Sequence, residues 1–425
     1  MTFHPQGSNV YSPNGTKLIK LLLTGDNWLD PSTFRVMFDL LNTETVAGRE
    51  LRTISGPWSF FKRMRVLCNG QIVEDIDDYN RVAEMFSILT SRHARDNVAA
   101  EAFGKNWDSR DYRYLKVDCD NYRGITAGDF QTVCFKPLSG LLSQPKYIPF
   151  RYCPITIELE LVSDYDTPII SKFSTEPSDG INDENFFLAS NTSKLWLIQN
   201  VQAKCDVVPL DNALDNSFAE HLLSGEALPI NYNTYISQIQ NLLSGTNGQQ
   251  KVRLNVTRAL SRLKSAFITL DKAIINESLM IGRKSWNDFY SPMQAYAQNY
   301  GKMESKGEFE FQVQLGAKLY PEYPIRSHSE AYYQLRKTLG VQSSNTHSFD
   351  IDHKEYRDNK FILAIDFERI IEAGFSGMNT RAGDILNLRF DHMDSNSANY
   401  AHQVHIVLHS DCIMEIRDGG VTVLD

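Results

Sequence analysis

Apolar and polar residues alternate along many short segments of this chain. Because successive side chains of a β-strand point to opposite faces, alternation with a period of two predicts a strand with one buried face. The clearest succession of strand-like runs lies near the C-terminus, at residues 361–367, 386–390, 404–408, 412–417 and 421–424. We expect a turn at Ser410 and Asp411 between the third and fourth runs, so that the chain ends within a sheet of paired strands.

The first half of the chain repeats this alternation. The runs that predict strands there are residues 18–23, 34–40, 64–68, 71–73, 155–161 and 195–208. Asn69 and Gly70 stand between two of these runs, and an Asn-Gly pair favours the left-handed backbone of a two-residue hairpin turn. Residues 163–193 are polar and too numerous for a hairpin turn, so we expect an exposed loop there.

In a few places the apolar spacing changes to three and four residues, which predicts helices. The segment 78–103 predicts one helix, with Asp77 or Asp78 placed to cap its start. The apolar positions of this helix are Val82, Met85, Phe86 and Leu89. In the second half we expect helices at residues 234–243 and 327–339. The clear strands of that half are residues 252–257, 266–270 and 309–315.

The pattern lapses around residues 209–216, and we place a domain boundary there. A chain of 425 residues exceeds the roughly 250–300 residues at which a single core stops growing. We therefore expect an extended N-terminal arm at residues 1–17, followed by domains at residues 18–208 and 209–425. Each half offers roughly seven or eight strands, which suits a mainly β fold of two tandem eight-stranded antiparallel jelly-roll sandwiches with a few short helices in the connections.

Composition and charge narrow the functional classes. Hydrophobic residues make up 42% and charged residues 22%, as in ordinary globular proteins. The net charge of −9 and the single lysine among the first seventeen residues argue against a basic arm, so we expect no sequence-specific nucleic-acid recognition. No apolar run approaches the roughly 18 residues of a membrane span, and we expect neither a span nor a signal peptide. The six cysteines form no Cys-x-x-Cys pair, which favours buried thiols over a zinc or redox site.

The strongest candidate for catalysis or metal binding lies in the last predicted strands. It comprises His402, His405 and His409, with Asp391, Asp394 and Asp411 nearby. On a strand, His405 and His409 share a face but stand roughly 13 Å apart, at about 3.3 Å per residue, which is too far to chelate one metal. His402 points to the other face. We therefore expect polar side chains on an outward face rather than a metal site or a general base.

Other chemical motifs are absent or have simpler explanations. The chain contains no His-x-His of the bicupin enzymes and no Gly-x-Ser-x-Gly, Gly-x-Gly-x-x-Gly or Walker-type sequence. Asp75, Asp77 and Asp78 lack the Gly and the terminal Glu of a calcium loop and suit the start of a helix. We expect no catalytic, cofactor-binding or metal-binding residues, no cofactor and no enzymatic activity.

Two sets of side chains leave alternatives open. Two basic clusters suit solvated faces or subunit contacts better than nucleic-acid binding. They are Lys62, Arg63 and Arg65, and Arg258, Arg262 and Lys264. Four tyrosines suit either the core or an interface, where aromatic residues are enriched. They are Tyr320, Tyr323, Tyr332 and Tyr333.

Three segments carry a likeness to a known family. They are residues 135–149 leading into the strand at 154–161, residues 319–325 (Leu-Tyr-Pro-Glu-Tyr-Pro-Ile) leading into the helix with Tyr332, Tyr333 and Leu335, and residues 404–421. With these segments the chain resembles the double jelly-roll major capsid proteins of icosahedral DNA viruses, most nearly those of polinton-like viruses and virophage relatives. The likeness covers most of the chain.

This resemblance implies a structural function. Three copies would form a homotrimer of six jelly rolls, a pseudo-hexameric capsomer that contacts neighbouring capsomers, penton proteins and minor capsid proteins in an icosahedral shell around a DNA genome. The protein would be made in the host cytoplasm or nucleus and reside in the virion capsid. Residues 1–15 of the arm would order only on assembly, either on the inner side of the shell or beneath an adjacent subunit. The alternatives are a trimeric jelly-roll spike or carbohydrate-binding protein and, last, a sandwich enzyme.

Overall fold

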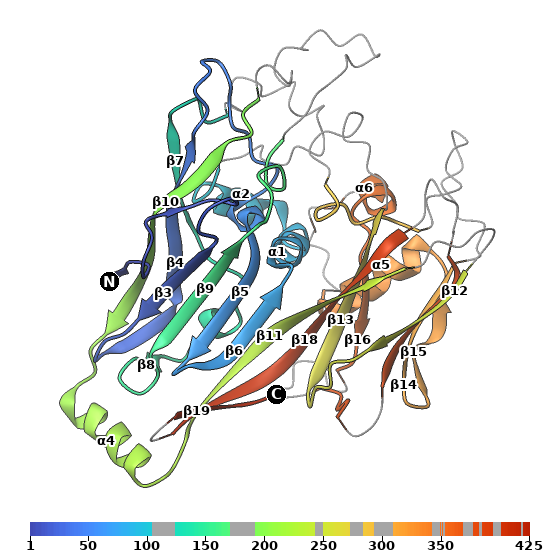
Figure 1. The fold of residues 1–425 in the computed structure, drawn as a ribbon. Coiled ribbons are helices and arrows are strands. Elements are labelled where there is room, and N and C mark those ends of the chain that lie inside the picture. Colours follow the sequence, from blue (N-terminus) through green and yellow to red (C-terminus); the bar gives the residue numbers. More distant parts are fainter. Residues whose placement is uncertain are drawn as a thin grey trace.

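Two β-sandwiches lie side by side in the computed structural model of the chain (Figure 1). The structure describes residues 1–103, 124–170, 192–242, 250–272, 284–292, 309–341, 349, 351, 353–368, 377–381, 385–393, 401–417 and 420–425. Most of the predicted loop at 163–193 lies outside these residues. The fold is mainly β, as the alternation predicts.

Each sandwich consists of two antiparallel sheets. The strands of the first are β1 (Thr2–Phe3), β2 (Val10–Tyr11), β3 (Leu18–Leu23), β4 (Trp28–Asn42), β5 (Phe61–Cys68), β6 (Gln71–Asp77), β7 (Phe130–Phe135), β8 (Ile148–Pro149), β9 (Ile155–Leu161) and β10 (Trp196–Val208). The strands of the second are β11 (Leu228–Asn241), β12 (Gln250–Val256), β13 (Leu263–Lys272), β14 (Glu310–Leu315), β15 (Lys318–Ile325), β16 (Leu363–Asp366), β17 (Leu386–Met393), β18 (Ala401–Arg417) and β19 (Gly420–Leu424). The helices are α1 (Tyr79–Ile88), α2 (Arg92–Ala99), α4 (Asn212–Leu223), α5 (His328–Thr338) and α6 (His353–Asp358), with 3-10 turns η1 (Pro57–Phe60) and η2 (Leu141–Ser143).

The two sandwiches share one topology. The sheets of the first have the orders β1-β10-β4-β7 and β3-β9-β5-β6, and those of the second have the orders β11-β18-β13-β16 and β12-β17-β14-β15. Taken along the chain, β3 to β6 correspond to β12 to β15, β7 to β16, β9 to β17 and β10 to β18. A helix follows the fourth strand of both series, α1 after β6 and α5 after β15. This repeated order is the predicted pair of tandem jelly rolls.

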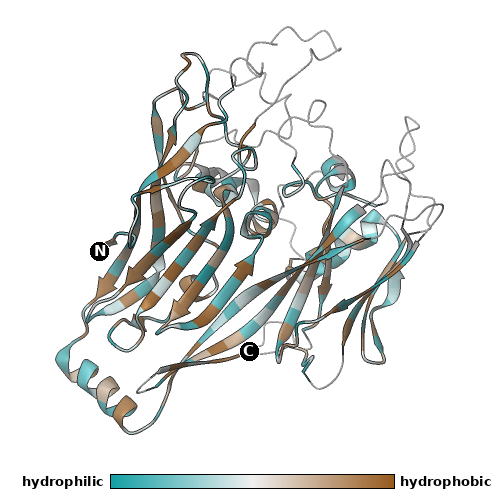
Figure 2. Cartoon of the chain, viewed as in Figure 1, coloured by the Kyte–Doolittle hydropathy of each residue, from teal (hydrophilic) through white to brown (hydrophobic). Residues whose placement is uncertain are grey.

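The apolar side chains on the inward face of each strand fill the cores. Figure 2 shows apolar and polar residues alternating along β5, β6 and β9, and Ile19, Leu21 and Leu23 of β3 are fully buried. The hairpin between β5 and β6 has left-handed backbone at both turn residues, with φ of 48° at Asn69 and 81° at Gly70. The predicted Asn-Gly turn is therefore confirmed.

Two predictions for the second half are wrong. Residues 234–241 are not helical but belong to β11, which pairs with β18 along its whole length. Their alternation, with Thr234 buried on the same face as Tyr232, carries more weight than their three- and four-residue spacings. No turn occurs at Ser410 and Asp411, because β18 runs unbroken through both residues. Ser410 is paired in the ladder on both sides, with Thr234 and Leu263.

The helix predictions are partly confirmed. The predicted helix at 327–339 is α5, and Ser327 caps it in a capping box with Glu330. The single helix predicted at 78–103 is two helices, α1 and α2, and Ser91 caps the second. Asp78 stands at the N-cap position of α1 but makes no capping hydrogen bond, because its backbone is left-handed and its carboxylate pairs with Lys62.

The N-terminal segment packs on its own chain rather than waiting for a neighbour. Strands β1 and β2 both pair with β10, and the Gln6 amide donates to the Lys20 carbonyl at 2.9 Å. Tyr11 is 1% exposed within the core, and the Phe3 ring contacts Phe150 at 5.9 Å between centroids. The expectation of an arm that orders only on assembly is therefore wrong, because these residues supply the first strand of the first sandwich.

Tyr11→Ala tests this docking. Removing a fully buried aromatic ring should lower the free energy of unfolding by about 3 kcal/mol, because the cavity cannot collapse completely. The neighbouring Val10→Ala is the matched control, since Val10 is 46% exposed and should change stability by less than about 0.5 kcal/mol. Urea unfolding followed by Trp fluorescence would measure both. Equal stability of the two variants would show that the segment is not part of the core.

Candidate functional site: the interface between the two sandwiches

The histidine series of β18 lies between the two sandwiches. His405 is 6% exposed, and His409 is half-buried with its ring stacked on Tyr235 at 5.1 Å between centroids. The prediction of polar side chains on an outward face is therefore wrong for these two residues. The first sandwich covers this face of the β11-β18-β13 sheet, as Figure 1 shows from the position of α1. His402, three residues earlier, is exposed.

Each buried imidazole has a different neighbour. His405 Nε2 lies 3.7 Å from Asp271 Oδ2, and His409 Nδ1 lies 3.2 Å from Ser265 Oγ. The remaining members of the candidate are separate, because Asp391 pairs with Arg253 at 2.7 Å and Asp411 with Lys264 at 3.6 Å, while Asp394 lies outside the described residues. The structure therefore does not gather the predicted candidate residues into one constellation. Among the residues that the structure describes, no group of three His, Cys, Asp or Glu side chains could hold a metal.

Helix α1 supplies the apolar part of the interface. The ring of Phe86 packs on Tyr235 of β11 at 4.6 Å and on Phe267 of β13 at 5.2 Å between centroids. Both partners project from the face of the second sandwich that carries His405 and His409. Aromatic pairs at such distances contribute roughly 0.5–1.5 kcal/mol beyond their buried area. The helix therefore binds the second sandwich while packing on the first.

Arg81 of α1 supplies the polar part. Its guanidinium donates to the carbonyl oxygens of Leu270 at 3.1 Å and Ser285 at 2.5 Å and to Thr269 Oγ1 at 3.1 Å, all in the second sandwich. It also lies 4.8 Å from the centre of the Phe289 ring. Burial lowers the pKa of Arg81 to about 10, so the group stays charged at neutral pH. A buried charge held by several acceptors fixes the geometry of a contact, since a shifted position would leave donors unpaired.

Glu74 of β6 forms a second polar contact lower in the interface. Its carboxylate accepts hydrogen bonds from the Ser139 hydroxyl and, at 2.9 Å, from the Gly140 amide, and the Thr234 hydroxyl of β11 also bonds it. Burial raises the pKa of Glu74 to about 7, and these hydrogen bonds oppose the rise. Nearby, the Tyr232 hydroxyl of β11 donates to the Val73 carbonyl at 3.0 Å. The edge strand β6 is thus bound to the second sandwich.

A polar cavity of about 580 Å³ opens between the two sandwiches. The first sandwich contributes Lys62, Asp78 and Arg81, and the second contributes Asp271 and His405. Burial lowers the pKa of His405 to about 4, and the nearby Arg81 adds to this effect while Asp271 opposes it. The imidazole is therefore neutral at pH 7 and adds no positive charge beside the arginine.

The basic and acidic clusters singled out from the sequence are mostly paired with each other. Arg63 forms ion pairs with Asp75 at 2.7 Å and Asp77 at 3.1 Å, and Arg65 pairs with Glu158 at 2.8 Å. The second basic cluster is also bonded, to acidic side chains and to carbonyl oxygens near the C-terminus. These contacts favour a structural role for both clusters.

The four tyrosines divide between core and surface. Tyr320 packs on Phe367 at 5.4 Å, and Tyr332 packs on Tyr356 at 5.0 Å between centroids. Tyr323 is 83% exposed and Tyr333 is 57% exposed. Residue type alone could not separate these pairs, because tyrosine occurs both in cores and at interfaces.

The remaining sequence expectations concern thiols and membranes. Within the described residues, Cys68, Cys153, Cys205 and Cys412 are buried free thiols, and Cys134 is half-buried. None of the described helices combines the length and the apolar character that crossing a membrane requires.

The interface predicts a pH dependence of stability. Burial lowers the pKa of His405 and of His409 to about 4, whereas an unfolded histidine titrates near 6.5. The unfolded chain therefore binds protons that the folded chain does not, and each imidazole removes up to about 3 kcal/mol of stability as pH falls from 6.5 to 4. Buried His328 acts in the same direction, while Glu74, with its raised pKa, acts in the opposite direction between pH 4.5 and 7.

His405→Asn isolates one of these contributions. The difference in free energy of unfolding between wild type and variant should shrink as pH falls from 6.5 to 4, because the variant has lost one proton-binding site of the unfolded chain. The exposed His402→Asn is the matched control, because it removes an imidazole of the same strand that lies outside the interface. Urea unfolding at several pH values would measure both. A constant difference for His405→Asn would contradict its neutral buried state.

Gly140→Ala tests the close approach of the two sandwiches. A Cβ at this position would lie 1.5 Å from the carbonyl oxygen of Asn233 in β11, although φ of −72° at Gly140 suits any residue. The methyl group should push β11 away and lower the melting temperature, at a cost of about 1–3 kcal/mol or more. Gly25→Ala is the matched control, since its Cβ would make an ordinary contact at 3.6 Å. Equal melting temperatures would show that the sandwiches separate without cost.

The chain is similar to known proteins in its fold but not in its sequence. No protein family and no curated protein matches the chain. The structure of PBCV-1 VP54, fitted into a reconstruction of the virophage Sputnik, matches with a TM-score of 0.60 and 11% identity over 100% of this chain and 95% of that chain. A cryo-EM structure of the Sputnik virophage matches with a TM-score of 0.56 and 9% identity over 99% and 88%. The Faustovirus major capsid protein matches with a TM-score of 0.55 and 10% identity over 98% and 90%. The chain therefore has the double jelly-roll fold of these viral capsid proteins.

Proposed function

We propose that the chain is a major capsid protein that trimerises into pseudo-hexameric capsomers and builds an icosahedral shell around a DNA genome. The observation that carries the proposal is the fixed pairing of two jelly rolls of identical strand order in one chain. The likeness to solved viral capsid proteins supports it. Its location would be the capsid of a virion, after synthesis in the cytoplasm or nucleus of a host cell.

The proposed domains are one jelly roll at residues 18–208, to which β1 and β2 of residues 1–17 add strands, and a second at residues 209–425. In support, the sheets that contain β1 to β10 use residues 2–208 only, and the other two use residues 228–424. Helix α4 lies between the last strand of the first series and the first strand of the second. The domains act as one tile, because Arg81 and Phe86 bind both.

Geometry explains why such a tile suits a shell. Two equivalent jelly rolls in each chain give six in a trimer, and six equivalent units can surround a point as a hexagonal tile does. A head-to-tail contact that closes after three chains forms a ring rather than a filament. A stable trimer of this kind should bury well above roughly 1,000 Å² at each contact.

The proposed partners follow from the same geometry. A hexagonal tile contacts neighbouring capsomers at its sides, and a closed icosahedral shell also needs penton proteins at its vertices and minor capsid proteins between tiles. The net charge of −9 and the ion pairing of the basic clusters favour a shell that encloses DNA without recognising its sequence. The burial of His405 and His409 favours a structural rather than an enzymatic protein.

The mass of the purified protein tests the proposal. We expect a particle three times the 48.5 kDa of the chain in multi-angle light scattering, and a near-hexagonal outline in negative-stain images of the same sample. A monomer at all concentrations would contradict the capsomer. A trimer that binds a glycan array and has an elongated outline would favour the spike or carbohydrate-binding alternative.

A further inference from the structure

The contact between the two sandwiches joins two different surfaces. The first sandwich contributes the edge strand β6 and helix α1, and the second contributes Tyr232 of β11 together with the face of the β11-β18-β13 sheet that carries Tyr235 and Phe267. The corresponding surfaces are the β15 and α5 edge of the second sandwich and the outer face of the β10-β4-β7 sheet of the first. Figure 1 shows these two at opposite ends of the molecule. Each chain therefore has two uncovered surfaces that correspond to the two sides of its internal interface: the β15 and α5 edge, which corresponds to β6 and α1, and the β10-β4-β7 face, which corresponds to the β11-β18-β13 face.

The outer face of the β10-β4-β7 sheet carries an apolar row. Leu197, Leu41 and Phe130 lie beside one another on three adjacent strands, because the register pairs Leu41 with both of the others. Phe130 is 57% exposed, and Leu41 and Leu197 are half-buried. The second sandwich carries a similar row, Val407 beside Phe267, and there Phe86 of α1 covers it.

The β15 and α5 edge carries exposed tyrosines where the first sandwich has its contact residue. Asp78 and Ser327 are the N-cap residues of α1 and α5. Two positions before each N-cap stands a buried isoleucine, Ile76 and Ile325, which aligns the two strands. Four positions before each N-cap stand Glu74, which bonds Thr234 of the second sandwich, and Tyr323, which is 83% exposed. Tyr333 of α5 is also exposed.

We infer that the β15 and α5 edge of one copy packs on the outer face of the β10-β4-β7 sheet of the next copy. This inference rests on the proposed trimer and names its contact surfaces. The contact repeats the intrachain interface, so that six sandwiches alternate around a ring of three chains. Tyr323 and Tyr333 supply the aromatic anchors, and Leu41, Leu197 and Phe130 supply the apolar face that receives the edge.

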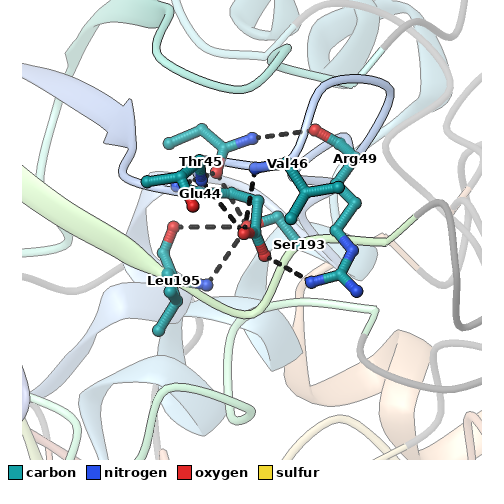
Figure 3. A network of polar contacts seen from close by, with 7 residues as sticks. Glu44, Thr45, Val46, Arg49, Ser193 and Leu195 are labelled. Atoms are coloured by element: carbon teal, nitrogen blue, oxygen red, sulfur yellow. Dashed lines mark hydrogen bonds and ion pairs between the residues drawn. The ribbon is translucent and has the colours of Figure 1, made fainter.

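The receiving face is held in place before assembly. Asn42, at the end of β4, donates from Nδ2 to the Ile125 carbonyl at 2.8 Å and accepts from Ser193 Oγ at 2.7 Å. Figure 3 shows the surrounding contacts, in which Arg49 bonds the Glu44 carboxylate at 3.0 Å. These contacts tie the ends of β4 and β10 together, beside the apolar row. A preorganised face loses less conformational entropy on binding.

The contact works through side chains rather than through added strands. β15 is an edge strand with Pro321 and Pro324 in its sequence, and proline has no amide hydrogen to donate to another strand. Edge strands with prolines resist indiscriminate pairing. Tyr323 stands between these two prolines, so its ring projects from an edge that other chains cannot extend.

Three variants test the surfaces. Phe130→Asp damages the receiving face, and the double variant Tyr323→Asp with Tyr333→Asp damages the edge. Each should raise the concentration needed for trimers by more than about tenfold, because a carboxylate would be buried without a partner. Leu223→Asp on α4 is the matched control, since Leu223 is 74% exposed and lies on neither surface, and it should stay trimeric. Circular dichroism melting would confirm that all three fold.

Mixing the two damaged proteins identifies the head-to-tail contact. Phe130→Asp retains an intact edge and the tyrosine variant retains an intact receiving face, so the mixture should form dimers at twice the 48.5 kDa chain mass but no closed trimers. If the wild type is trimeric and the damaged variants are trimeric too, the proposed contact surfaces are wrong but the proposed trimer is not. A monomeric wild type would overturn both. A mixture that stays monomeric would refute the head-to-tail pairing.

Discussion

The burial of one charged side chain between the two sandwiches is the constraint on which the arrangement of the chain depends. Arg81 belongs to a helix of the first sandwich, yet its hydrogen bonds go to Thr269, Leu270 and Ser285 of the second. A guanidinium taken out of water tolerates few alternative positions, since each would leave donors unpaired. Phe86 adds buried apolar area, and the resulting hydrophobic attraction is favourable but not directional. Together these two contacts hold the two sandwiches against each other.

The interface also solves the problem of exposed sheet edges. β6 is the edge of its sheet, and an open edge invites pairing with other chains. Here the Val73 carbonyl accepts from Tyr232, and the carboxylate of the next residue bonds Ser139, Gly140 and Thr234. Gly140 permits this approach, since any side chain would strike the backbone of β11. Covering β6 within the chain leaves one open sheet edge fewer on its surface.

Much of the fold could be predicted from alternation alone, because half-buried strands record their faces residue by residue. The hairpin at Asn69 and Gly70 and the helix after Ser327 carried strong local signals. Helix α4 was missed because Leu222 is its only buried residue, which leaves no apolar stripe to detect. β18 was divided at Ser410 because polar residues resemble a turn until their partners are known. Residues 1–17 were expected to order only on assembly because they are rich in Pro, Gly and Asn, and the two-residue strands β1 and β2 are too short to show a period.

The interface was harder to predict, because it joins residues far apart in the sequence. Arg81 and Phe86 lie on a helix that was predicted. The histidines were assigned to an outward face because the sequence does not reveal that the first sandwich covers the face of the second sandwich that carries them. The equivalent positions Glu74 and Tyr323 show how the two uses of one surface differ. Glu74 lies in a contact that forms once, during folding, so a titratable group can stay buried among fixed donors. In the proposed trimer Tyr323 stays in water until assembly, and tyrosine suits this use because it tolerates solvent at its hydroxyl and contributes apolar area when covered.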